Sequence, residues 1–333
     1  MPSSAQDWTE IRNKAALLKS EIAKVIVGQE EVIEQMLASL FCRGHCLIIG
    51  VPGLGKTMLV RTLGQALGLN FNRIQFTPDL MPTDILGSEI LQAGDGGVRR
   101  FEFTQGPIFT NLLLADEINR TPPKTQAALL EAMQERTVTV GGECYQLEEP
   151  FTVYATQNPI EHEGTYPLPE AQLDRFFFTL QIKYPEFEQE KEIVRQTIGE
   201  PGPEPQAVMS REEVLQVQAA IREVPVPDHV LDTVLKLVSS TRPGTEDASE
   251  LAREYIGWGA GPRASQYLTQ ASQAFAILRG HNSASVEDVY DAALPILRHR
   301  VIPNYHATGE GLTADDIVKK LIEQSKDHAV KPV

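Results

Sequence analysis

The feature that most constrains this chain is the glycine-rich segment Gly50–Thr57, with the sequence GVPGLGKT. It matches G-x-x-x-x-G-K-[ST], in which glycines let the backbone turn sharply and approach an anion closely. Successive N–H groups of such a loop form a concave anion site, and Lys56 adds a positive charge for β- and γ-phosphates. The Thr57 hydroxyl is the expected Mg²⁺ ligand. The predicted nucleotide-binding residues here are Gly50, Pro52, Gly53, Leu54, Gly55, Lys56, Thr57 and Met58.

The flanking residues have the pattern that such a loop needs. Residues 45–49 (HCLII) predict a buried strand, and residues 57–67 predict a helix whose N-terminus faces the phosphates. The alternative is a plain glycine loop with a surface lysine. The strand on one side and the helix on the other favour the phosphate site.

Two carboxylates follow a second apolar run. Residues 112–115 (LLLA) show no alternation, which is typical of a parallel strand buried on both faces, and Asp116 and Glu117 come directly after it. Ligands of parallel sheets bind at the carboxyl ends of the strands. We therefore predict that Asp116 reaches the Mg²⁺ ion, directly or through water, and that Glu117 aligns the attacking water. The alternative is a pair of solvated acids at a strand end.

Two further polar residues are candidates by position. Asn158 follows the predicted strand at 151–156 and could hold the γ-phosphate or the water, or could be a turn residue before Pro159. Arg263 lies in the first turn of a helix that begins near residue 261. A cation is unfavourable there because of the helix dipole, so its presence indicates a nearby anion, or else an exposed arginine tolerated at small cost.

The corner at Val27-Gly28 separates two predicted helices, at 9–24 and 30–43, shortly before the first strand. In nucleotide-binding folds such a corner often holds the adenine. A plain helix–helix turn explains the same residues equally well, so both interpretations stay open at this point.

The order of elements predicts an α/β fold with a parallel sheet, followed by a helical domain. Residues 86–104 resemble a hairpin inserted into the α/β scaffold, and residues 137–145 predict a second hairpin around Gly141-Gly142. From residue 185 onward the pattern is helical. We predict an αβα nucleotide-binding domain at residues 1–184 and an all-helical domain at residues 185–333.

The charge balance restricts the partners. Lys and Arg number 30 and Asp and Glu number 45, so the formal charge is −15, which weighs against a nucleic-acid partner and also serves solubility. Residues 1–24 lack the apolar core of a signal peptide, and no stretch approaches the roughly 18 apolar residues of a membrane span. We expect a cytoplasmic protein without a membrane span.

Taken together, these motifs resemble the MoxR family of AAA+ ATPases over about residues 20–325. The similarity is densest in residues 115–124 (ADEINRTPPK), in residues 155–159 (ATQNP) and in the stretch up to Arg175-Phe176. The resemblance implies that residues 50–57 are Walker A and that Asp116-Glu117 are Walker B. It also implies that Asn158 is sensor 1, Arg175 the arginine finger and Arg263 sensor 2. One departure is Gly261, where the family usually has serine.

The resemblance further implies a homo-hexameric ring with ATP and Mg²⁺ between neighbouring subunits. It also implies a client protein and, in many relatives, a separate von Willebrand A-type partner. The first functional hypothesis is an ATP-driven machine that remodels or matures clients by metal insertion or complex assembly. The alternatives are a nucleic-acid translocase and a nucleotide-gated scaffold. The tip of the inserted hairpin at residues 94–97 (GDGG) is not basic, which disfavours the translocase.

Overall fold

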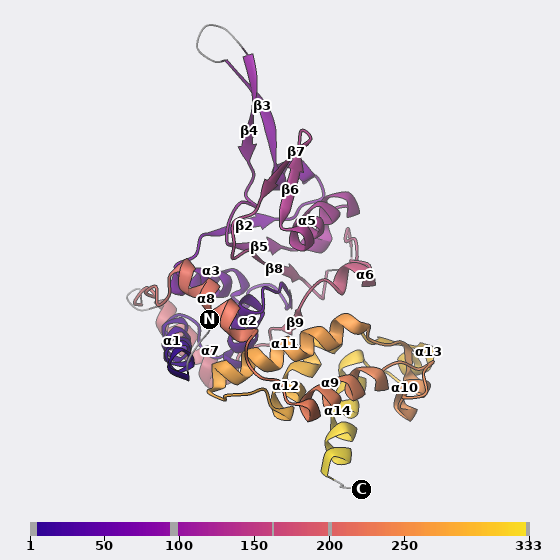
Figure 1. Cartoon of the computed structure of the whole chain (residues 1–333). Helices are drawn as coiled ribbons and strands as arrows, with labels where there is room; N and C mark the ends of the chain where they lie inside the picture. Colours follow the sequence, from indigo (N-terminus) through magenta and orange to yellow (C-terminus); the bar gives the residue numbers. More distant parts are fainter. Residues whose placement is uncertain (1–4, 94–98, 162, 199–201, 331–333) are drawn as a thin grey trace.

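A parallel sheet packed between helices forms the first half of the molecule, and a helical lid forms most of the second half (Figure 1). The computed structural model describes residues 5–93, 99–161, 163–198 and 202–330.

The strands are β1 (Cys46–Ile49), β2 (Phe71–Gln75), β3 (Gly87–Ala93), β4 (Arg99–Gln105), β5 (Leu112–Asp116), β6 (Thr137–Val140), β7 (Glu143–Gln146), β8 (Thr152–Gln157), β9 (Phe178–Gln181), β10 (Ile256–Trp258) and β11 (Ile302–Pro303). The helices of the first half are α1 (Ala5–Ala23), α2 (Glu30–Phe41), α3 (Lys56–Ala66), α4 (Pro82–Leu86), the 3-10 helix η1 (Ile118–Arg120), α5 (Pro123–Glu135) and α6 (Glu170–Leu173). The later helices are α7 (Phe187–Ile198), α8 (Arg211–Ile221), α9 (Asp228–Ser240), α10 (Glu250–Tyr255), α11 (Pro262–Arg279), α12 (Val286–Leu297), α13 (Tyr305–Gly309) and α14 (Ala314–Val330).

The central sheet has the strand order β2-β5-β8-β1-β9, and every neighbouring pair is parallel. Alternate residues of one strand enter two different cores. In β5, Leu112 and Leu114 pack against the α1–α3 side, whereas Leu113 and Ala115 pack against the α4–α5 side. All four are fully buried. The sheet is therefore covered on both faces, as the unbroken apolar run at residues 112–115 predicts.

Two antiparallel hairpins leave this body on the α5 side. The β3–β4 hairpin projects away from the sheet, and the β6–β7 hairpin lies near its base (Figure 1). Phe103 of β4 stacks on Tyr145 of β7 at a centroid distance of 4.1 Å, which joins the two hairpins. Both hairpins confirm the sequence-based expectation. The predicted non-basic tip at residues 94–97 lies outside the described residues.

The start of α5 differs in one detail from what the sequence pattern predicts. The pattern predicts Thr121 as the N-cap of a helix that begins at Pro122. In the structure Pro122 itself is the N-cap, and the Thr121 hydroxyl donates to the Thr77 carbonyl at 2.9 Å. The Thr121 side chain therefore fastens the loop after β2 instead of capping the helix.

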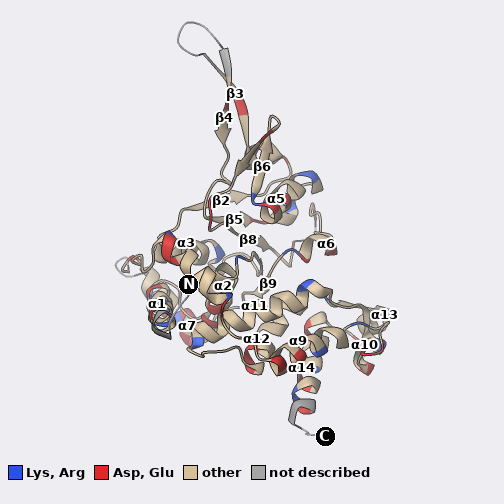
Figure 2. Cartoon of the chain, in the orientation of Figure 1, with Lys and Arg blue, Asp and Glu red and all other residues tan. Residues whose placement is uncertain are grey.

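The lid is helical apart from the short antiparallel pair of β10 and β11. Figure 2 shows Lys and Arg interspersed with Asp and Glu on the helices of both halves. Helix α8 packs against both halves, since it contacts α11 of the lid and its Gln218 donates to the Leu40 carbonyl of α2 at 2.7 Å. The predicted domain boundary at residues 184/185 stays a proposal.

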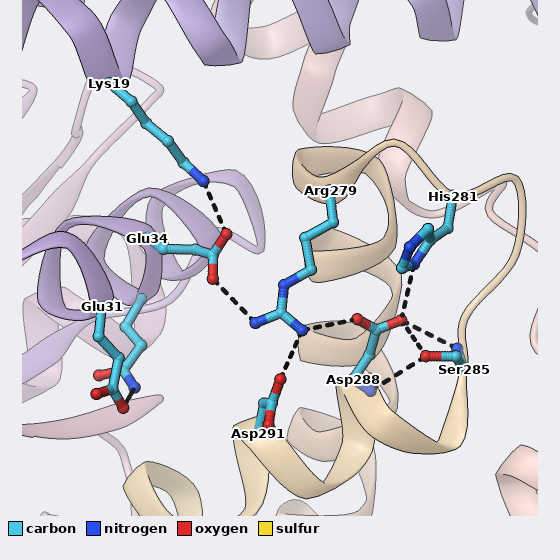
Figure 3. Close-up of polar contacts among 9 residues, drawn as sticks. Lys19, Glu31, Glu34, Arg279, His281, Ser285, Asp288 and Asp291 are labelled. Atoms are coloured by element: carbon cyan, nitrogen blue, oxygen red, sulfur yellow. Dashed lines mark hydrogen bonds and ion pairs between the residues drawn. The ribbon is translucent and has the colours of Figure 1, made fainter.

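An ionic network fixes the lid to the first half (Figure 3). Arg279, the last residue of α11, donates to Glu34 of α2 at 2.9 Å and to Asp288 and Asp291 of α12 at 3.1 and 2.6 Å. Lys19 of α1 donates to the other oxygen of Glu34 at 2.7 Å. Because Asp288 is fully buried, its charge requires such partners.

His45, just before β1, is a buried polar side chain with a pH consequence. Its Nδ1 accepts from the Val153 N–H at 2.9 Å, so its Nε2 donates to the Met133 carbonyl at 3.0 Å. Burial lowers the pKa of His45 to about 4, below the ordinary value of about 6.5. His45 therefore contributes stability above pH 6.5 that is lost as the pH falls toward 4, and linkage makes this about 3 kcal/mol.

We predict that His45→Gln lowers the thermal midpoint at pH 7 and that the gap to the parent chain narrows as the pH falls to 4. The parent loses the neutral-histidine contribution over this range, whereas glutamine does not titrate. Calorimetric midpoints of both proteins at several pH values test this. A gap that widens or stays constant would contradict it.

Candidate functional site

The loop after β1 has the backbone that an anion site requires. Gly53 and Gly55 adopt φ values of 84° and 70°, which strain a residue with a side chain. Gly55 is also the N-cap of α3, so the first N–H groups of that helix open toward the loop. The Lys56 ammonium donates to the Gly50 and Val51 carbonyls at 2.7 and 2.8 Å. The Lys56 ammonium therefore lies over the loop, where its positive charge would add to the N–H groups that bind an anion.

The acidic pair lies within the electrostatic reach of Lys56. Burial lowers the pKa of Lys56, and the negative charges of Asp116 and Glu117 oppose that shift. Asp116 is buried, and its Oδ1 accepts from the Thr156 hydroxyl at 2.6 Å. Its Oδ2 accepts from Arg73 Nε and Nη2 at 3.0 and 2.7 Å. The predicted Mg²⁺ ligand is thus already held in a fixed orientation.

Glu117 has a strained backbone. Its φ and ψ are 57° and 49°, the left-handed region that glutamate rarely occupies. The strain is held by a hydrogen bond from the Glu117 N–H to the Thr156 hydroxyl at 2.8 Å. Its Oε2 accepts from Gln75 Nε2 at 2.9 Å. Such outliers cluster at functional sites, so the geometry is consistent with the role predicted for Glu117.

Asn158 follows β8, between the strands that carry the loop and the acidic pair. Its Oδ1 accepts from the Ile160 N–H at 3.2 Å. Its Nδ2 is buried and has no hydrogen-bond partner among the described residues. An orphaned buried donor costs about 1–3 kcal/mol, so a ligand oxygen that accepts from it would be stabilising. This donor fits a phosphate group beside the loop.

The two predicted arginines point elsewhere. Arg175 Nη1 donates to the Leu130 carbonyl of α5 at 2.9 Å. Arg263 Nη1 donates to Asp174 Oδ2 at 2.8 Å. Each guanidinium has a protein partner away from the loop at residues 50–57. The structure thus brings Lys56, Asp116 and Glu117 together and gives each arginine another partner, Arg175 on α5 and Arg263 on Asp174.

A cavity of about 800 Å³ adjoins the loop. The corner at Val27 and the loop residues Pro52, Gly53, Leu54, Gly55 and Met58 line the same cavity, whereas Gly28, Gly50, Lys56 and Thr57 are not among its lining residues. Ile193 and Val194 of α7 form another wall. The Val27-Gly28 corner is therefore next to the phosphate loop in space, which favours the adenine interpretation over a plain turn.

The sequence analysis missed several residues around the acidic pair. Arg73 and Gln75 occupy alternate positions of β2, and Gln75 is in register with Asp116 of β5. Period-2 alternation puts the Arg73 and Gln75 side chains on one face of β2. Pairing β2 with β5 would therefore have predicted that both side chains lie near the acidic pair. The α7 wall of the cavity was harder to predict from the sequence, because an amphipathic helix usually packs its apolar face into the core. None of the α7 residues, which are all described, is buried.

The residues also fit a divalent cation. The Thr57 hydroxyl and the Asp116 carboxylate are hard oxygen donors of the kind Mg²⁺ prefers, and both flank the position of Lys56. Outside this acidic pair, no cluster of three metal-ligating side chains is present in the described ranges. In those ranges, no helix is long and apolar enough to cross a bilayer.

A parallel sheet with a phosphate loop after β1, an acidic pair after β5 and a helical lid defines an AAA-type ATPase. The description "ATPase family associated with various cellular activities (AAA)" matches residues 45–178, and "AAA lid domain" matches residues 248–321. The first range runs from just before β1 to the first residue of β9 and includes the acidic pair, and the second runs from just before α10 into α14.

Relatives of known name narrow the class. The chain is 39% identical to Chaperone MoxR1 of Mycobacterium tuberculosis, across 94% of this chain and 85% of that protein. It is 30% identical to Protein MoxR of Paracoccus denitrificans, across 94% and 95%. A solved structure from Cytophaga hutchinsonii, assigned as an ATPase, is 40% identical, covers 96% of both chains and has a TM-score of 0.89. The chain belongs to the MoxR family of AAA ATPases.

We predict that Gly55→Ala weakens nucleotide binding and lowers the thermal midpoint, because alanine in the left-handed region costs about 1–2 kcal/mol and would shift the loop. Gly244→Ala is the matched control, since Gly244 has open space around it and lies outside this φ region. Titration with a fluorescent nucleotide and calorimetry measure both effects. Equal behaviour of the two variants would contradict the prediction.

Proposed function

We propose that this ATPase hydrolyses Mg²⁺-ATP in a homo-hexameric ring and uses the energy to remodel or mature client proteins. The observation that carries the proposal is the convergence of three segments at one sheet edge. The loop at residues 50–57 follows β1, the acidic pair ends β5, and Asn158 follows β8. Because these strands are adjacent and parallel, their carboxyl ends form one site.

The binding roles follow from the groups present. The N–H groups of the loop and the Lys56 ammonium bind the β- and γ-phosphates, so Lys56 exchanges its two loop carbonyls for phosphate oxygens. Thr57 and Asp116 would hold Mg²⁺, which neutralises phosphate charge when bound. The adenine occupies the cavity beside Val27 and Gly28, where Ile193 and Val194 supply an apolar wall.

Glu117 accepts a hydrogen bond from the attacking water and aligns it with the γ-phosphorus. The Gln75 amide donates to Glu117 Oε2 at 2.9 Å, and we assign the water to the other carboxylate oxygen, Oε1. Asn158 donates its unpartnered Nδ2 to the γ-phosphate or the water. Glu117 thus acts on the nucleophile, and Asn158 acts on the nucleophile or on the phosphoryl group that is transferred to it, with ADP as the leaving group.

Arg175 completes the site of the next subunit. Its guanidinium donates to the Leu130 carbonyl of α5 and not to its own phosphate loop. A guanidinium from a neighbour stabilises the charge that spreads over the γ-phosphate oxygens, and such fingers are worth about 10³–10⁵ in rate. Arg263 serves as the lid's sensor of the nucleotide and exchanges Asp174 for a phosphate oxygen.

A protein client and a cytoplasmic location fit this activity. The name of one relative, Chaperone MoxR1, supports a client protein, and the β3–β4 hairpin offers exposed apolar side chains at Ile90, Leu91 and Phe101. Metal insertion or complex assembly would be the maturation step, with a von Willebrand A-type protein as a further partner. The interspersed charges give little support to a nucleic-acid translocase (Figure 2).

We predict that Glu117→Gln binds ATP as tightly as the parent chain but hydrolyses it at least about 10²-fold more slowly, because the amide cannot draw a proton from water. Nucleotide affinity and steady-state turnover measure the two effects. ATP-loaded Glu117→Gln rings should also retain the client in a pull-down from cell extract. A variant that turns over at the parent rate would exclude the role of Glu117. A variant that keeps full cellular function would support the scaffold alternative.

We predict that Arg175→Ala assembles and binds ATP but hydrolyses it about 10³–10⁵-fold more slowly. Mixing it with Glu117→Gln chains should restore turnover, because each alanine chain then receives an intact arginine from its neighbour. Size-exclusion chromatography checks assembly, and phosphate release checks the rate. If the alanine ring hydrolyses ATP at the parent rate, the action across the interface is wrong.

A further inference from the structure

One buried lid arginine, Arg300, contacts the backbone on both sides of Arg175. Arg300 lies after α12, and its side chain is only 2% exposed. Its Nη2 donates to the Asp174 carbonyl at 2.9 Å and to the Phe176 carbonyl at 2.7 Å. Its Nε donates to Asp174 Oδ1 at 2.7 Å. These contacts flank residue 175 on its N- and C-terminal sides.

Four hydrogen bonds occupy four of the five N–H donors of Arg300. Its Nη1 donates to the Ile296 carbonyl at 2.6 Å, which ties the guanidinium to α12, and its Cζ lies 5.1 Å from the centre of the Tyr267 ring of α11. His299 adds a further contact, with its Nε2 3.2 Å from the Phe176 carbonyl. A guanidinium with this many partners has little freedom, so the backbone around Arg175 follows the position of the lid.

Asp174 extends this connection to Arg263. One carboxylate oxygen accepts from Arg300 and the other accepts from Arg263, at 2.7 and 2.8 Å. Arg263 begins α11, whereas Arg300 follows α12, so two lid elements meet on the residue next to Arg175 in the chain. The Arg175 side chain itself is held on the opposite side by the Leu130 carbonyl of α5.

We propose that Arg300 is a positioning residue for Arg175, so that the lid of each subunit sets the arginine that serves its neighbour's ATP. This inference rests on the proposed function, because it needs Arg175 to act across the subunit interface. Arg300 touches neither nucleotide nor reacting atoms. Its effect arises from holding two carbonyls and one carboxylate at fixed places around residue 175.

Arg300→Lys is the informative change. Lysine keeps the positive charge that Asp174 requires but, as a point charge on a flexible stem, cannot bind both carbonyls and the carboxylate in one plane. A displacement of about 1 Å in a group that must meet a transition state costs on the order of 10² in rate. We therefore expect kcat to fall about 10²-fold, with nucleotide affinity unchanged.

Arg298→Lys is the matched control. Arg298 is also a lid arginine that reaches the sheet domain, since it donates to the Thr179 carbonyl of β9 at 3.1 Å and pairs with Asp315 at 3.0 Å. Among the described residues, its hydrogen bond and ion pair go to Thr179 and Asp315 and not to Asp174 or Phe176. The control chain should lose stability to a similar extent in calorimetry and keep its kcat.

Mixed rings separate positioning from a general structural role. Chains with Glu117→Gln cannot hydrolyse ATP but donate an intact Arg175, so they should restore turnover to Arg175→Ala chains. The same Glu117→Gln chain should also restore Arg300→Lys chains, whose own nucleotide sites are intact. The double variant Glu117→Gln/Arg300→Lys should fail to restore Arg175→Ala chains, whereas Glu117→Gln/Arg298→Lys should succeed.

The outcomes divide cleanly. If Arg300→Lys rings keep the parent kcat, or if the Arg300→Lys double variant restores Arg175→Ala chains fully, the positioning role is overturned. If Arg175→Ala rings themselves keep the parent rate, the proposed action of Arg175 across the interface is wrong. That failure is distinct from a failure of the positioning role of Arg300. Arg300→Gln, which retains one amide donor, replaces the lysine variant in every arm if the latter does not assemble.

Discussion

Burial of the central strands on both faces is the constraint on which the rest of this structure depends. The side chains of Leu112 to Ala115 are all enclosed, so no charged group can be accommodated along β5 before its end. An ionised carboxylate buried without partners costs several kcal/mol, and Asp116 avoids this because it has Thr156 and Arg73. Parallel pairing then collects the polar strand ends at one edge, where we propose that ATP is hydrolysed.

Much of this arrangement could be predicted from the sequence because it depends on local patterns. Unbroken apolar runs predict doubly covered strands, and the glycines at positions 53 and 55 predict the loop, whose positive φ values require them. The prediction of Thr121 as the N-cap of α5 was wrong, because a threonine hydroxyl can donate to a distant carbonyl instead of accepting from an N–H of its own helix. Short elements such as β10 and α13 were too brief to show a period.

The contacts of the arginines could not be predicted, because they depend on how the lid packs against the sheet domain. Arg300 carries no motif, and its partners at residues 174 and 176 are more than a hundred positions away in the chain. Arg263 could be assigned to an anion from its place at a helix start, but sequence offers two anions, a phosphate and Asp174. The contact of Arg73 with Asp116 is easier to predict than those of the lid arginines, since it follows once β2 is paired with β5.

The two contacts of Asp174 differ in strength, and that difference gives the lid a direction of response. The pair with Arg263 is 38% and 34% exposed, and such ion pairs contribute about 0–1 kcal/mol. In the pair with Arg300, the arginine side chain is closed to solvent. Removing the partner of a buried charge costs about 3–5 kcal/mol. A nucleotide phosphate can therefore draw Arg263 away cheaply, while Arg300 keeps hold of the segment. In the proposed mechanism, the lid then reorients around its own ATP and moves Arg175 of the same chain, which serves the ATP of the neighbouring subunit.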